Sequence, residues 1–117
     1  MISFTEAMEI RNRRDHDYDD EYGGPIRMHA TRGMVYTEAP KQQDDLKRIS
    51  GIAVVLEARL NDYGIYTFKQ IMEWNQAAIE EFSLLLTFKD RIERDDWVSQ
   101  ARFFYNEKQR VGKSYAA

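Results

Sequence analysis

The 117-residue sequence contains no cysteine, which excludes disulfides, thiol nucleophiles and thiolate metal sites. It also lacks any apolar run near the roughly 20 residues needed to span a bilayer. An excess of positive charge is missing too, because 17 lysines and arginines stand against 20 acidic residues, for a net charge of −3. Phosphate neutralisation usually requires a basic body, so this balance argues against a general nucleic-acid binder. It does not exclude a local basic patch.

Patterns for catalysis and metal binding are likewise missing. The sequence has no Ser/His/Asp arrangement with a plausible frame, no glycine-rich phosphate loop and no His/Cys metal spacing. The acidic run at residues 15–21 does not have the frame of a calcium-binding EF-hand loop. We therefore expect a protein that is not an enzyme, with no catalytic residues, no cofactor and no metal site. Residues 1–4 lack the basic and apolar regions of a secretory signal, so we expect an intracellular protein on the cytoplasmic or mitochondrial matrix side.

The most informative stretch, residues 44–60, has the pattern of two short helices joined by a very tight turn. Apolar residues recur at helical spacing on both sides of the turn, at Leu46, Ile49, Leu56 and Leu60. Gly51 can adopt the left-handed backbone angle that such a turn requires. Ile52 would point inward and hold the two helices together. This layout is that of a helix-hairpin-helix unit.

Backbone N–H groups at the start of the second helix of such a unit can hold an anion. The candidate residues for this hairpin site are Lys47, Arg48, Ser50, Gly51, Ile52 and Ala53. The alternative is a purely structural turn that lets two helices pack. The acidic balance of the chain favours this structural interpretation.

The rest of the chain after residue 43 also has a helical pattern. We expect helices over 44–49, 53–63, 68–74, 76–85 and 94–109. Gly64 is placed to end a helix, and Thr67 and Asn75 are placed to cap the next two. A second short turn at 87–92 carries Asp90 where the first carries Gly51, which favours a duplicated hairpin unit. We predict a helical domain over 44–110 and a frayed tail over 111–117.

The first 43 residues differ from this domain. A capping-box spacing predicts a short helix over about 4–13, and an acidic segment closed by Gly and Pro follows. Residues 26–40 alternate only weakly between apolar and polar, so the pattern leaves open whether they form strands. We expect residues 1–43 to be an extended arm that lies on a neighbour. The expected contacts of this arm are Phe4, Met8, Met34, Val35 and Tyr36.

Four pieces of the sequence together resemble a known module, namely residues 45–52, 56–61, 64–71 and 91–98. Residues 44–102 resemble a helix-hairpin-helix module appended to the 24-kilodalton-type subunit of respiratory NADH dehydrogenase and to a bacterial large-subunit ribosomal protein. There are two departures. Ala53 replaces the second glycine of the usual Gly-Ile-Gly turn, and Asp90 stands in a second turn that usually contains glycine. Both changes weaken anion binding, and neither harms packing.

The sequence therefore predicts an all-α, helix-hairpin-helix type domain of four to five helices with an extended N-terminal arm. The resemblance implies a non-catalytic accessory subunit that docks with protein subunits of a respiratory complex or a ribosome. Further expected partner contacts are Arg91, Arg94, Phe103 and Tyr105. The alternative is a sequence-independent nucleic-acid binder that holds phosphate on the hairpin backbone. Its salt dependence would distinguish it from a mostly apolar docking surface.

Overall fold

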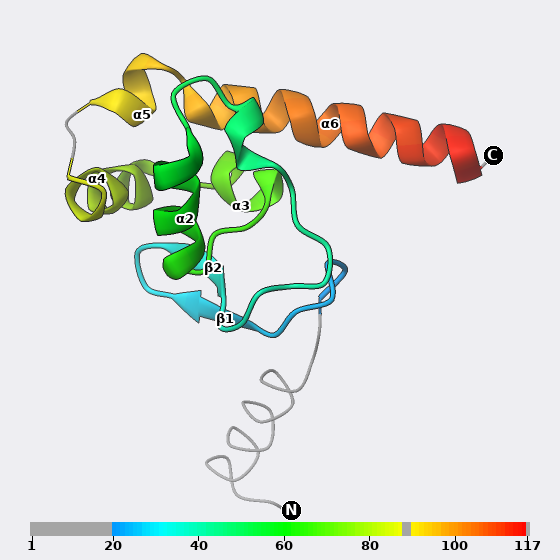
Figure 1. Cartoon of the computed structure of the whole chain (residues 1–117), viewed down its shortest axis with the longest axis horizontal. Helices are drawn as coiled ribbons and strands as arrows, with labels where there is room; N and C mark the ends of the chain where they lie inside the picture. Colours follow the sequence, from blue (N-terminus) through cyan, green and yellow to red (C-terminus); the bar gives the residue numbers. More distant parts are fainter. Residues whose placement is uncertain (1–19, 88–89, 117) are drawn as a thin grey trace, which may run out of the picture.

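The computed structural model describes residues 20–87 and 90–116, with side chains up to residue 111. The helix expected over 4–13 lies outside these residues, as do Phe4 and Met8. The elements are, in chain order, β1 (Ile26–His29), β2 (Gly33–Tyr36), the 3-10 helix η1 (Leu46–Arg48), α2 (Val54–Asp62), α3 (Phe68–Met72), α4 (Gln76–Leu85), α5 (Arg91–Arg94) and α6 (Trp97–Ala116). The fold is thus largely helical, as predicted, and its described part also contains a two-stranded sheet (Figure 1).

Local sequence signals define the helix boundaries in the middle of the domain. Gly64 follows α2 with a φ of +84°, the left-handed angle that glycine adopts without strain. The hydroxyl of Thr67 accepts a hydrogen bond from Gln70 N at 3.2 Å, and Gln70 Oε1 accepts one from Thr67 N at 3.1 Å, so the two residues form a capping box. Asn75 accepts from Ala78 N at 2.9 Å and caps α4. These three predictions are confirmed.

A single apolar core joins η1 and the helices. Trp74 stacks on Phe82 with ring centroids 4.5 Å apart, and its ring lies 6.5 Å from that of Trp97. The side chains buried completely or nearly so are Trp97, Phe82, Leu46, Ile49, Leu60, Ile65, Ile71, Leu86 and Ile92. Each large apolar side chain buried in this way contributes about 1.5–3 kcal/mol. The core therefore extends from η1 to the start of α6 and fixes the position of the first hairpin.

Residues 26–36, where the sequence pattern left strands undecided, form an antiparallel hairpin in which Ile26 pairs with Tyr36 and His29 with Gly33. The hairpin packs on the helices of the same chain. Gln70 Nε2 donates to Met34 O at 2.9 Å, and Tyr36 N donates to Gly64 O at 2.9 Å. Residues 26–36 therefore belong to the fold of the domain. They do not form part of an arm that extends away from it. Two four-residue strands with weak alternation gave too little signal for this hairpin to be predicted.

The loop of the hairpin is fixed to α4 by one carboxylate. Glu81 accepts a hydrogen bond from the Thr31 hydroxyl at 2.7 Å and forms an ion pair with Arg32. The Thr31 hydrogen bond, followed by the one from Arg32, holds the pKa of Glu81 below its ordinary value. Arg32 also lies over the ring of Tyr63, 5.3 Å from its centroid. The hairpin is thus attached to the helical body at both ends.

Helix α6 extends to Ala116, past the predicted end at residue 109. Figure 1 shows its C-terminal end projecting beyond the other described elements. Among the described residues, no helix is both long and apolar enough to cross a membrane.

Candidate interaction site

The first hairpin is a compact turn between η1 and α2. Asp45 caps η1 by accepting from Lys47 N at 3.2 Å, and Ile52 N donates to Ile49 O at 3.0 Å. Gly51 has a φ of +104°, and Ile52 is buried in the core as predicted. The sequence thus predicts the conformation of this turn well.

The start of α6 covers one side of the hairpin. A Cβ atom on Gly51 would lie 2.5 Å from Asp95 Oδ2 and 2.9 Å from Trp97 Nε1. Gln100 Oε1 accepts from Ser50 N at 2.8 Å, while Gln100 Nε2 donates to Ser50 O at 3.3 Å and to Asp95 O at 2.6 Å. A carboxylate and a glutamine side chain therefore occupy this side of the turn, where they disfavour a phosphate. Nothing in the local sequence marks Gln100 for this role.

The two basic residues of the candidate hairpin site are engaged within the chain. Lys47 Nζ lies 2.7 Å from Asp45 Oδ1 and 3.2 Å from Glu57 Oε1. The hydrogen bond from Lys47 lowers the pKa of Asp45, and the bonds to Asp45 and then Glu57 raise the pKa of Lys47. Arg48 Nη2 lies 3.4 Å from Glu107 Oε1, and its guanidinium lies 4.5 Å from the centroid of Phe104. Phosphate binding at the hairpin stays a prediction that these contacts disfavour.

The first turn of α2 is the part of the hairpin that remains open to solvent. Ala53, the N-cap residue, makes no side-chain capping hydrogen bond. Val54 and Val55 follow it with 68% and 71% of their surface exposed. Two exposed valines make this turn a better apolar contact than a phosphate site.

The second turn brings acidic residues next to the predicted basic contacts. Asp90 has a φ of 62° and begins α5. Arg94 Nε lies 3.3 Å from Asp95 Oδ1 and is largely exposed, and Arg91 lies one turn before it. Acidic neighbours reduce the positive field here, as the sequence suggests. A partner role for Arg91 and Arg94 stays a prediction.

The contacts expected from the arm lie partly inside the chain. Tyr36 is buried and donates from its hydroxyl to Asp20 Oδ2 at 2.5 Å. Burial, and then this hydrogen bond, raise the pKa of Tyr36. Val35 packs against the core, and Met34 is half-buried. These residues hold the β-hairpin of residues 26–36 in place. A role for them in partner binding stays a prediction.

Within residues 97–111, whose side chains the structure describes, helix α6 presents one large aromatic side chain to solvent. Phe103 is 62% exposed, whereas Tyr105 is half-buried against the core. Arg102, Asn106 and Arg110 are also exposed and lie on the same side of the helix as Phe103, because residues three and four apart are neighbours on a helix. These three polar residues were not predicted from the sequence, although a helical projection of residues 97–110 would have grouped them with Phe103.

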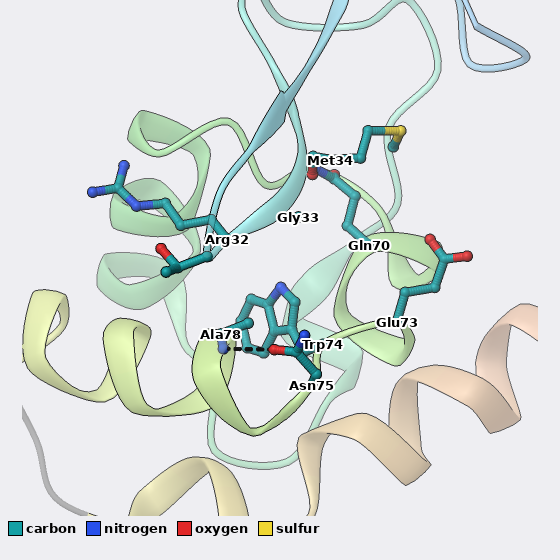
Figure 2. Close-up of a pocket in the computed structure, with 9 residues that line it drawn as sticks. Arg32, Gly33, Met34, Gln70, Glu73, Trp74, Asn75 and Ala78 are labelled. Carbon is teal, nitrogen blue, oxygen red and sulfur yellow. Dashed lines mark hydrogen bonds between the residues drawn. The ribbon is translucent and has the colours of Figure 1, made fainter.

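A small pocket of about 40 Å³ lies between the β-hairpin of residues 26–36 and α3 (Figure 2). Trp74 Nε1 is buried there without a hydrogen-bond acceptor among the described residues. Figure 2 shows the indole of Trp74 beneath Gly33 and Gln70, while Arg32 extends away from the pocket. A volume of this size suits one or two water molecules that would satisfy the indole N–H.

The comparison with protein families identifies the module. Residues 46–105 match the family described as the RS2/RL21/YNQ2 HHH domain, where HHH denotes helix-hairpin-helix. This match covers half of the chain, so the chain belongs to this family. The predicted helix-hairpin-helix module is confirmed.

The curated relatives include proteins of both ribosomal subunits. The chain is 48% identical over 66 residues to large ribosomal subunit protein bL21 of Jannaschia sp., covering 56% of this chain and 26% of that protein. It is 39% identical over 61 residues to small ribosomal subunit protein uS2 of Methylobacterium nodulans, covering 52% of this chain and 18% of that protein.

A third relative is an uncharacterized 22.9 kDa protein in the nqo2 3′ region of Paracoccus denitrificans, 43% identical over 60 residues, which cover 50% of this chain and 28% of that protein. Its name gives a position only, so it does not specifically support the respiratory complex that the resemblance implied. The chain thus spans between 18% and 28% of the length of these three relatives. No solved structure matches it.

Proposed function

We propose that this chain is a non-catalytic docking module of a ribosomal assembly. The observation that supports the proposal is the recurrence of residues 46–105 in proteins of different subunits, bL21 of the large one and uS2 of the small one. A segment that corresponds to 26% of one and 18% of the other of two such different proteins is a transferable unit. A ribosomal assembly would also agree with the intracellular location that the sequence predicts.

The structure supports docking over chemistry. Its first hairpin is filled by Asp95, Trp97 and Gln100, and the basic residues beside it are paired. Surfaces are available for docking among the described residues, including the first turn of α2 and the outward side of α6. A rigid core that presents such surfaces is suited to holding partners together.

Sedimentation of the full chain from its native cells tests the proposal. A tagged chain should sediment with ribosomal particles in a sucrose gradient and should shift with the subunits when magnesium is withdrawn. A chain that stays with the free proteins, or one that follows membranes carrying NADH dehydrogenase, would overturn the proposal. Tagged green fluorescent protein controls for the tag.

A further inference from the structure

Helix α6 has a net positive charge in a chain whose net charge is negative. Helix α6 contains four basic residues and one acidic residue, which leaves 13 basic and 19 acidic residues for the remainder of the chain. The single acidic residue, Glu107, lies beside Arg48 at 3.4 Å and so faces the body of the domain. An acidic protein that carries one basic helix has an uneven field that attracts anions to that helix.

The outward face of α6 is defined here as Arg102, Phe103, Asn106 and Arg110, and Glu107 borders it, four residues after Phe103 and three before Arg110. Residues 102, 106 and 110 are four apart, so they form one row along the helix, and Phe103 lies next to that row. All four residues are exposed. The nearest acidic side chain in sequence on the N-terminal side, Asp96, caps the helix by accepting from Ser99 N at 3.3 Å.

The opposite side of α6 explains why this face points outward. Trp97 and Ala101 are buried in the core. Lys108 Nζ lies 2.8 Å from Asp44 Oδ1 and is also placed over the ring of Tyr22. Phe104 packs against Phe68 with centroids 5.2 Å apart. These contacts fix the rotation of the helix, so the four outward residues are held in place before any partner arrives.

We propose that the outward face of α6 binds RNA, and this inference rests on the proposed function. Two arginines separated by two turns can contact phosphates, and an exposed phenylalanine between them can stack on an unpaired base. Asn106 adds hydrogen-bond donors and an acceptor for a base edge or a sugar. A protein partner would be expected to bury Phe103 in an apolar surround, but the neighbours of Phe103 on this face are charged or polar.

Basic residues late in a helix also offset its macrodipole, which is the simplest alternative explanation. That explanation accounts neither for Arg102, which lies near the start of the 20-residue helix, nor for a 62% exposed phenylalanine beside it. It predicts that removing the arginines lowers helix stability without changing any affinity for RNA. Circular dichroism of each variant therefore accompanies the binding measurements.

The test is fluorescence anisotropy of the full chain with a labelled single-stranded RNA of about 16 nucleotides, at about 50 and 200 mM salt. For the Arg102→Gln, Arg110→Gln double variant, the slope of log Kd against log salt should fall by about one for each arginine. Phe103→Ser should weaken binding about tenfold and leave the slope unchanged. A duplex of the same length should bind more weakly than the single strand.

A matched control removes the same number of charges at the first hairpin. The Lys47→Gln, Arg48→Gln variant should bind the RNA like the unchanged chain. Loss of binding in this variant, with the α6 variants unaffected, would overturn the inference in favour of the hairpin. Absence of binding by the unchanged chain at low salt would overturn it as well.

The gradient experiment separates the two proposals. If the chain sediments with ribosomal particles but the α6 variants sediment equally well, the RNA inference fails and the docking function stands. A protein from the particles could instead occupy the outward face. In that case Phe103→Ser would release that protein, the unchanged chain would not bind the labelled RNA, and the RNA inference would fail. If the chain binds RNA through α6 but never sediments with the particles, the docking function fails.

Discussion

The two tight turns of the domain place different residues at a positive φ. Gly51 has a φ of +104° and is faced closely by Asp95 and Trp97, whereas Asp90 has a φ of 62° and is exposed. The first turn therefore needs glycine for both its conformation and its lack of a side chain. The second needs only the conformation, which aspartate tolerates at some cost. The comparison separates backbone strain from crowding, and four measurements test it.

The largest effect is expected from Gly51→Ala. The new methyl group meets Asp95 Oδ2 and Trp97 Nε1 and sits on a left-handed backbone, so the free energy of unfolding should fall by about 3 kcal/mol. Urea unfolding followed by tryptophan fluorescence measures it. The matched control is Gly33→Ala, which has a φ of +77° with no atom within 4 Å of the added Cβ. It should cost about 1–2 kcal/mol, and equal losses at both sites would show that crowding contributes nothing.

Gln100→Ala tests the link between the first turn and α6. The change removes the hydrogen bonds to Ser50 N, Ser50 O and Asp95 O and should lower the free energy of unfolding by about 1–2 kcal/mol. Amide exchange at Ser50 should speed up as its acceptor is lost. Gln109→Ala on the same helix serves as the control and should change stability by less than about 0.5 kcal/mol.

Asp90→Gly should stabilise the chain by about 0.5–1 kcal/mol. Glycine removes the strain of a left-handed angle, and no capping hydrogen bond of the Asp90 side chain is lost. Thermal unfolding at neutral pH measures the gain. A loss of stability would mean that the Asp90 carboxylate has a stabilising role in the second turn.

The smallest effect concerns the pH dependence of the first turn. The pKa of Asp45 is lowered in the fold, so its contribution is complete above its ordinary pKa and is lost as the pH falls through the lowered value. The pKa of Lys47 is raised, so its contribution persists at neutral pH and is lost as the pH rises through the raised value. Carbon-detected NMR titration of both side chains should give these two directions. Because both groups are exposed, added salt should reduce both shifts.

The features predicted correctly from the sequence are those that depend on near neighbours. Gly64, Thr67 and Asn75 mark helix ends through contacts within a few residues, and each was found in that role. The inward side of each helix follows from a period of 3.6 residues in the same way. Gly51 and Ile52 also take the expected places in the first turn.

The features that were missed depend on residues far apart in the chain. Gln100 reaches Ser50 across fifty positions, and Glu81 reaches Thr31 and Arg32 across a similar distance. No local pattern encodes such contacts. Helix α6 also continues through Gly112 to Ala116, where a frayed tail was predicted, although an interior glycine costs about 1 kcal/mol.

The attachment of the β-hairpin has a consequence for how the chain is made. Its strands end at Tyr36, but the groups that hold it, Gln70 and Glu81, are translated later. A two-stranded hairpin on its own is at best marginally stable in water. We therefore expect residues 26–36 to emerge from the ribosome without fixed structure and to form the hairpin once α3 and α4 have folded. During synthesis, the helices made later would then provide the surface on which the earlier β-hairpin folds.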